Sequence, residues 1–186
     1  MKLLLCAVGV FLLALSAASA NQQTDNPDAC RFKILGPSDS TTKVAVTGPE
    51  DIVAMTHVVE QPDSPVEILA IDFKDSFISV VNEHFTHQLN CTAKIYNRSD
   101  QPIRGVGITL LVGTETGGPS GAGMMSPVQG PSLAPGHQLE ISACGGNGAG
   151  GAPNNHVRVL VFVNNVATND CSYYPSQRYP RPFGGS

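Results

Sequence analysis

The middle of the chain contains the histidine spacing closest to that of a metal site, in the segment Glu83-His84-x-x-His87. Zinc proteases carry His-Glu-x-x-His on a helix, so that both imidazoles face the metal. The residues around His84 favour strands instead, and two positions three apart on a strand project to opposite faces. We therefore expect no metal site and no cofactor, unless a turn brings the two rings together.

Serine and carboxylate patterns give no stronger sign of catalysis. The chain lacks the Gly-x-Ser-x-Gly sequence of many hydrolases, and Ser99 lies among turn-forming residues. Asp72 and Asp75 are near the end of a candidate strand, where carboxylates more often meet solvent or cap a turn than act as acid and base. We predict no catalytic residues and a protein that is not an enzyme. A hydrolase would require His84 and His87 to converge with a carboxylate in a cleft.

The C-terminal residues 173–186 combine tyrosine, arginine and proline. Tyrosine and arginine are typical anchors of protein interfaces, so Tyr173, Tyr174, Arg178 and Tyr179 are candidate binding residues. An ordinary disordered tail is the alternative interpretation. A partner-binding tail remains the first hypothesis for this segment.

Two connections are unusually rich in glycine, residues 113–135 and residues 145–155. Neither continues into the Gly-Lys-Ser/Thr of a phosphate-binding loop. We interpret both as long loops at the ends of the fold, which are either flexible linkers or contact surfaces. In the second case Met124 and Met125 would offer an adaptable apolar patch to a partner.

The N-terminus has the three parts of a secretory signal. Lys2 supplies a positive charge, residues 3–15 are almost continuously apolar, and Ala-Ser-Ala ends at Ala20. The apolar run is shorter than the roughly 20 residues that cross a bilayer, and no later segment is long and apolar enough to do so. We expect residues 1–20 to be removed, together with Cys6, and the mature chain to be secreted or periplasmic.

The charge of the chain argues against two classes of partner. The formal net charge is −4, and loss of Lys2 with the signal makes it about −5. A mildly acidic surface disfavours nucleic acid and anionic membrane as the main partner. The mature length is typical of one domain.

The other four cysteines are Cys30, Cys91, Cys144 and Cys171. An even number in an exported chain predicts two disulfides, and no pair has the Cys-x-x-Cys spacing of a zinc site. All of the possible pairings stay open. We favour Cys144 with Cys171, near the ends of neighbouring candidate strands, and Cys30 with Cys91, which would tether the N-terminal segment.

Apolar and polar residues alternate with a period of two in several segments separated by turn residues, and no window shows a comparable helical stripe. Asn164 and Asn165 follow one such segment and are expected to form a tight hairpin turn. The pattern predicts an all-β protein, an antiparallel β-sandwich over residues 64–172. The predicted strands are 66–73, 77–81, 89–96, 103–112, 139–143 and 157–163.

The N-terminal segment 21–63 carries shorter apolar runs at residues 31–35, 43–46 and 52–59, separated by Gly-Pro pairs. These runs favour short strands. They either add strands to the sandwich or form a separate lobe.

The runs AKIYNRSDQPIRGVGITLLV, LAPGHQLEIS and HVRVLVFVNN resemble the small immunoglobulin-like domains of exported bacterial proteins of the FxLYD or CARDB type. The resemblance covers residues 64–172 and implies an adhesion, assembly or accessory module with this sandwich fold. The chain departs from the FxLYD pattern where residues 110–113 replace an aromatic-Asp pair, and it lacks the Trp of antibody domains. The matching turn positions are Asn97, Ser99, Pro102, Pro135 and Gly136.

Two function hypotheses follow. The first is a non-enzymatic immunoglobulin-like module that makes protein-protein contacts at the cell envelope or outside the cell, with a partner that the sequence does not identify. The second is a carbohydrate-binding or accessory module, which would need several tyrosines exposed together on one surface. Those tyrosines are Tyr96, Tyr173, Tyr174 and Tyr179.

The chain also contains two N-glycosylation sequons, which begin at Asn90 and Asn97. In a eukaryotic host, Asn97 would be the better acceptor because it lies in a predicted turn. Asn90 precedes Cys91, which we expect to be disulfide-bonded.

Overall fold

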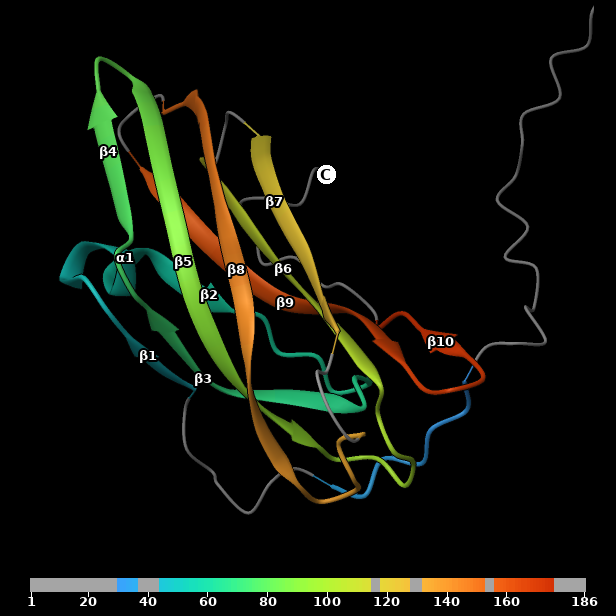
Figure 1. Ribbon diagram of the computed structural model, residues 1–186. Helices are drawn as coiled ribbons and strands as arrows, with labels where there is room; N and C mark the ends of the chain where they lie inside the picture. The colour runs from blue at the N-terminus through green and yellow to red at the C-terminus, as the bar shows by residue number, and fades with distance from the viewer. Residues whose placement is uncertain (1–29, 37–43, 115–117, 128–131, 153–155, 176–186) are drawn as a thin grey trace, which may run out of the picture.

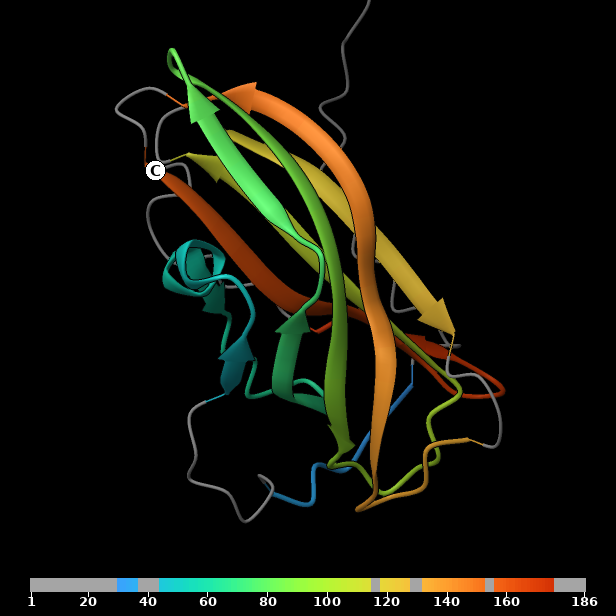
Figure 2. The ribbon, with the colours of Figure 1, turned by 60° about the vertical axis from the view of Figure 1, so that its left-hand side comes forward.

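The computed structural model describes residues 30–36, 44–114, 118–127, 132–152 and 156–175. Strands hold 62% of these residues and helix 5%, which confirms the all-β class. Two sheets pack face to face around one core, so the fold is a β-sandwich (Figures 1 and 2). The predicted signal peptide lies outside the described residues.

The first sheet is organised around its longest strand, and we call it the β5 sheet. Strands β3 and β4 follow one another along one side of β5, and β8 pairs along the other side. Strand β1 extends the sheet beyond β3. The bounds are β1 (Ala45–Thr47), β3 (Val66–Phe73), β4 (Phe77–Val81), β5 (His84–Asn97) and β8 (Gln138–Gly151).

The second sheet has the order β10-β9-β6-β7, with β2 also paired to β9, and we call it the β9 sheet. After β5 the chain crosses to this sheet, returns to the β5 sheet for β8 and crosses again for β9 (Figure 1). The bounds are β2 (Thr56–Val58), β6 (Gly105–Thr114), β7 (Gly118–Pro127), β9 (Val157–Ala167) and β10 (Ser172–Tyr173).

The core lies between the two sheets and follows the predicted alternation. Every second residue of β5 from Phe85 to Asn97 is buried. From the other sheet, Val106 to Val112 of β6 and Val157 to Val163 of β9 supply alternate β-branched and leucine side chains to the same cluster. The predicted strands 66–73 and 77–81 match β3 and β4 residue for residue.

Within residues 64–172 every described strand pair is antiparallel, as predicted, and the parallel pairs involve only the segment before residue 64. Strand β1 pairs with β3 in parallel, and β2 pairs with β9 in parallel. Alternation of side chains reports which face of a strand is buried and carries no information on the direction of its neighbour. The segment before residue 64 therefore adds strands to both sheets.

The chain passes from β1 to β2 through a short helix, α1 (Glu50–Met55), where strand was predicted over residues 52–59. Its local signals are Pro49 followed by Glu50 and Asp51 in the first turn, which suit a helix start. Ile52 is fully buried in the core. A six-residue helix is too short to show the periodicity on which the prediction relied.

The two glycine-rich connections were predicted to be loops, and this was wrong for much of each. Residues 118–127 form β7, which pairs with β6 along its whole length, and residues 145–151 belong to β8. In β8 the glycines have a packing role. An added Cβ at Gly148 would lie 2.6 Å from Cε1 of His87, and one at Gly150 would lie 2.7 Å from Cε1 of Phe85.

Asn164 and Asn165 do not form the predicted hairpin turn. Both lie inside β9, where the pairing with β6 shifts between Gly107 and Ile108 and leaves Asn164 as the extra residue of a bulge. A side chain at Gly107 would collide with the Asn164 side chain, so the bulge is accommodated by a glycine on the facing strand.

Two disulfides are present, and the favoured pairing was wrong. Cys91 of β5 faces Cys144 of β8 with a Cα–Cα distance of 5.0 Å, and Cys30 joins Cys171 at 5.2 Å. Because the glycines after Cys144 continue the strand, this cysteine lies in the middle of β8 rather than at its end. Its neighbour is therefore β5 and not the segment that holds Cys171.

Candidate interaction surface

The tip of the β5 sheet is a tight hairpin between β4 and β5. Asn82 and Glu83 form its two-residue turn, and both have positive φ, at 50° and 62°. This geometry matches the twist of the strands and fixes the register in which Val81 faces His84. The hairpin places β4 along one edge of the sheet (Figures 1 and 2).

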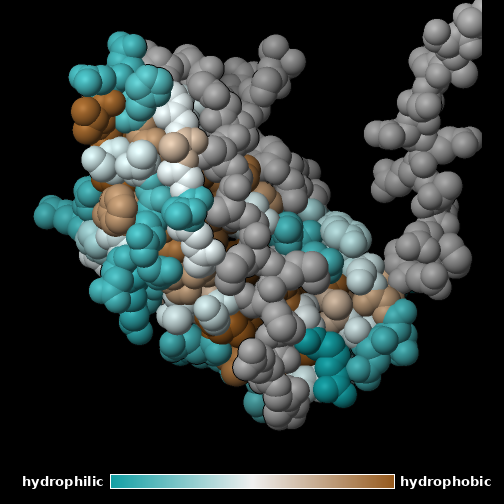
Figure 3. All heavy atoms as spheres, turned by 45° about the horizontal axis from the view of Figure 1, so that its top comes forward, coloured by the Kyte–Doolittle hydropathy of each residue, from teal (hydrophilic) through white to brown (hydrophobic). Residues whose placement is uncertain are grey.

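The outer edge of β4 pairs with no strand among the described residues. Two of its five side chains are large, apolar and exposed: Phe77 is 50% exposed and Val81 63%. Ile78 points inward and is buried. Figure 3 shows hydrophobic atoms at the surface among hydrophilic ones at the upper left, the side on which β4 lies.

The upper half of the β5 sheet consists of β4 and the parts of β5 and β8 that lie beside it. Its outward residues carry no Asp, Glu, Lys or Arg. We call them the uncharged face. Its exposed positions alternate with buried residues on β5 and with half-buried glycines on β8, as the pleat requires. Its members are Phe77, Ser79, Val81, His84, Thr86, Gln88, Asn147, Ala149 and Gly151.

The two histidines of this region project to opposite faces, as predicted. His84 is exposed, whereas His87 is 97% buried and its Nδ1 and Nε2 atoms have no hydrogen-bond partner. The His87 ring stacks on Phe85 at 5.9 Å, and burial lowers its pKa. Among the described residues, no three His, Cys, Asp or Glu side chains gather as a metal site.

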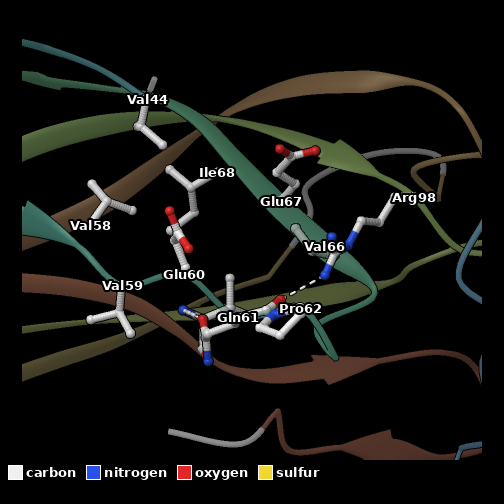
Figure 4. A pocket seen from close by; sticks show the side chains of 11 residues that line it. Val44, Val58, Val59, Glu60, Gln61, Pro62, Val66, Glu67, Ile68 and Arg98 are labelled. Carbon is white, nitrogen blue, oxygen red and sulfur yellow. Dashed lines mark hydrogen bonds between the residues drawn. The ribbon is translucent and has the colours of Figure 1, made fainter. Parts of the chain in front are cut away.

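A cavity of about 350 Å³ opens between the edges of the two sheets (Figure 4). Its apolar walls include one valine each from β2, β3 and β9, namely Val58, Val66 and Val163, and its polar groups include Glu60 and Arg98. Arg98 is engaged, because its guanidinium donates to the carbonyls of Ser64 and Gln61 at 2.6 Å each. The lining is therefore mixed, with apolar side chains beside Glu60, Gln61, Glu67 and Arg98.

Residues 59–65 form the loop between β2 and β3, and Gln61 ties this loop to the β9 sheet. Its side-chain amide donates to the carbonyl of Val163 and accepts from the Val163 N–H, at 2.8 Å each. Burial lowers the pKa of Arg98, and the nearby charges of Glu67 and Asp63 act in the opposite direction. Arg98 and Gln61 therefore hold the loop in place.

The predicted tail residues divide between structural and exposed positions. Tyr173 lies on β10, with its ring 5.7 Å from that of Phe32, and its hydroxyl donates to Asp63 at 3.3 Å. Burial, followed by the charge of Asp63, raises the Tyr173 pKa. Tyr174 is 69% exposed. Arg178 and Tyr179 lie outside the described residues, so their binding role stays a prediction.

The tyrosines do not supply one stacking face within the described part of the chain. Tyr96 is half-buried on β5, whereas Tyr173 is half-buried on β10 of the other sheet. Only Tyr174 presents a largely exposed ring. This arrangement does not support the carbohydrate alternative.

Met124 and Met125 are in β7 rather than in a loop, opposite Ile108 and Gly107 of β6. Their role in binding stays a prediction.

Asn97 is not the accessible turn residue that the sequon suggested. It is 0% exposed, and its amide donates to the carbonyls of Gln101 and Leu133. The Asn97 Oδ1 accepts from Ser99 N–H and Oγ at 2.9 and 2.8 Å. The Asn-x-Ser corner therefore organises the connection from β5 to β6. Asn90 is the more accessible of the two sequon asparagines.

The edge formed by β4 was not among the predicted sites. Its sequence signal is the run of residues 77–81, which is apolar at four of five positions and therefore on both faces of the strand. A strand buried on both faces would give the same run. The topology shows that β4 stands at an open edge, and the burial pattern shows that one of its faces is exposed.

Comparison with known proteins finds no matching family model, no matching curated protein and no matching solved structure.

Proposed function

We propose that this protein is a secreted or periplasmic, non-enzymatic immunoglobulin-like module that makes protein-protein contacts through β4. The observation that carries the proposal is an unpaired edge strand whose exposed side chains include Phe77 and Val81. An unpaired edge presents free peptide N–H and C=O groups to a partner strand. Exposed apolar side chains beside it add contact area.

The absence of edge protection supports this function. Soluble proteins commonly block an edge with lysine, proline, a bulge or a covering loop. Residues 76–81 contain no charge and no proline, and no described strand pairs with the outer edge of β4. Charged residues, Lys74 and Asp75 on one side and Glu83 on the other, only flank the strand.

The strand order supports the immunoglobulin-like part of the proposal. In that fold the first, second, fourth and fifth strands share one sheet, and the third, sixth and seventh share the other; this chain differs at the fourth strand. Here β3, β5 and β8 share one sheet, while β6, β9 and β10 share the other, with β7 beside β6. The disulfide at Cys91 departs from antibody domains because it joins two strands of one sheet. Fold alone assigns no function, so the exposed edge carries the argument.

The disulfides support an extracytoplasmic location. Both pairs among Cys30, Cys91, Cys144 and Cys171 are disulfide-bonded, which suits an oxidising compartment. Among the described residues, no helix has the length and apolar character needed to cross a membrane.

The test is a pull-down from the native secretome with the unchanged chain and two lysine variants. Ser79→Lys places a charge on the edge strand, and Thr86→Lys places the same charge on the neighbouring strand, directly opposite Ser79. We expect proteins captured by the unchanged chain to be lost with Ser79→Lys and kept with Thr86→Lys. Capture of nothing, or equal capture by all three chains, would contradict the proposal.

A fourth chain that ends at Pro175 tests the tail without removing β10 or Tyr173. Retained capture assigns the contact to β4, whereas complete loss assigns it to residues 176–186. Circular dichroism of every chain checks that each variant is folded.

A further inference from the structure

We propose that the partner of β4 is a second copy of this chain, which adds its own β4 in antiparallel orientation and joins two β5 sheets into one. The inference rests on the proposed contact function and names its partner. Its basis is the agreement between the free peptide groups of the strand and its exposed side chains.

The direction of the peptide groups follows from hydrogen bonds at the base of the hairpin. The Asn90 N–H donates to Ser76 Oγ at 2.8 Å, and the Asn90 carbonyl accepts from Lys74 N–H at 2.8 Å. Asn90 therefore points its peptide groups toward the β3 and β4 side of β5. By alternation, so do His84, Thr86 and Gln88.

These three residues of β5 face Val81, Ser79 and Phe77 of β4. Hydrogen-bonded pairs in an antiparallel ladder involve residues whose peptide groups point toward each other. The peptide groups of the intervening residues, Ile78 and Val80, consequently point away from β5. They are the groups available at the open edge.

One register uses all of these groups. A two-fold axis at Ser79 pairs Ile78 of each copy with Val80 of the other, giving about four main-chain hydrogen bonds. The same axis sets Phe77 opposite Val81 of the second copy, on the outward face. Cross-strand aromatic and β-branched pairs stabilise antiparallel sheets, so the two exposed apolar side chains cover each other.

Charge also favours a second copy. Within the ladder no residue from Phe77 to Val81 is charged, so an identical strand meets no like-charge repulsion there. The flanking acids Asp75 and Glu83 have positive φ, at 49° and 62°. The chain turns at both positions, so these acids lie outside the regular ladder.

The size of the contact sets its strength. A stable interface buries about 800 Å² per partner, and a five-residue ladder with two apolar pairs is smaller than this. We therefore expect a weak dimer that dissociates in the micromolar range or above. Association should depend on concentration rather than being permanent.

The first test is sedimentation of the purified full mature chain from low micromolar to submillimolar concentration. The weight-average mass should rise toward that of a dimer. Ser79→Lys sets two ammonium groups against each other on the two-fold axis, and its mass should stay at the monomer value. Thr86→Lys adds the same charge on β5 and should still dimerise.

The second test fixes the register by cross-linking under mild oxidation. A mixture of Phe77→Cys chains and Val81→Cys chains should form cross-linked dimers, whereas each variant alone should not. Positions 77 and 81 are about 13 Å apart along one strand, so a cross-link between them reports two chains.

Three results would overturn the second copy as partner. They are an unchanged chain that stays monomeric throughout, a Ser79→Lys chain that dimerises normally, and cross-linking of either single variant as strong as in the mixture. The unchanged chain could stay monomeric in sedimentation while Ser79→Lys still abolishes capture in the pull-down. That combination would reject the second copy as the partner and leave the proposed contact function intact.

Discussion

The two halves of the β5 sheet share one core and differ in what they present outward. In the lower half, β3 and the adjoining parts of β5 and β8 carry Glu67, Asp72, Lys94 and Glu140 on the outward side. The upper half presents the uncharged face and the open edge of β4. Both halves share β5 and β8, but β3 and β1 flank β5 in the lower half and β4 alone flanks it in the upper half, so the halves differ in their edge strand as well as in their side chains.

The outward side of the lower half carries charged side chains in contact with solvent. Lys94 and Glu140 face each other across β5 and β8. Asp72 accepts from Thr47 Oγ1 at 2.8 Å and pairs with Lys74 at 3.3 Å. These contacts lower the Asp72 pKa, with the Thr47 hydrogen bond as the larger cause. Such exposed pairs add little stability.

The inward sides differ as well. In the lower half, apolar side chains of β3, β5 and β8 meet in ordinary cross-strand pairs, such as Ile68 with Ile95. In the upper half, Phe85 and His87 lie against glycines of β8. The Cys91–Cys144 disulfide stands at the junction. The upper half therefore depends on backbone pairing and on the disulfide more than the lower half does.

Removing this disulfide should have the largest effect. In the double variant Cys91→Ala, Cys144→Ala we expect a loss of about 2–5 kcal/mol of unfolding free energy, since a cross-link limits the unfolded chain. Urea unfolding measures the loss. Hydrogen exchange should show the upper half losing protection before the lower half.

The matched control is Cys30→Ala, Cys171→Ala, which removes the other disulfide and leaves both halves of the β5 sheet untouched. Equal loss of protection in the two halves of the Cys91→Ala, Cys144→Ala chain would contradict the comparison.

A methyl group on the β8 glycine opposite His87 should have the next largest effect. In Gly148→Ala the new Cβ would lie 2.6 Å from Cε1 and 3.1 Å from Nε2 of His87, so the ring must move. We expect a loss of about 1–3 kcal/mol, measured by urea unfolding. Ala149→Ser, on the exposed side of the same strand, should change stability little; an equal loss there would argue against the packing role of the glycine.

The buried histidine should give the smallest effect and make the upper half sensitive to pH. Because burial lowers its pKa in the folded state, the unfolded chain binds the proton more readily, and stability should fall as pH drops below about 6.5. His87→Leu removes an unpartnered polar ring and should add about 1 kcal/mol at pH 7.

Thermal unfolding between pH 5 and pH 8 measures this effect, at values chosen around the ordinary histidine pKa of about 6.5. The pH dependence should be weaker in the His87→Leu chain than in the unchanged chain, with the exposed His84→Gln as control. An identical pH profile for unchanged and His87→Leu chains would remove His87 as its source.

The strands predicted correctly from the sequence are those in which large side chains show the alternation. Residues 66–73 and 77–81 were placed correctly because valine, isoleucine and phenylalanine alternate there or fill the segment. It missed β7 and the second part of β8, because glycine has no side chain from which burial can be read. It missed α1 because the helix has only six residues.

The candidate site was the harder part to predict. Tyr173 was chosen by residue type, yet it packs on Phe32 and bonds to Asp63. Phe77 and Val81 were assigned to a strand and not to a surface. Whether a strand is central or at an edge depends on its neighbours, and these come from distant parts of the chain.

The all-β class, the oxidised cysteines and the inward positions of the long strands could be predicted from the sequence, because they follow from local alternation and cysteine number. The tertiary structure decided which cysteines pair, that the glycine-rich segments are strands and that β4 stands at an open edge. Each of these depends on which strand lies beside which, a property of the folded chain that no local pattern contains.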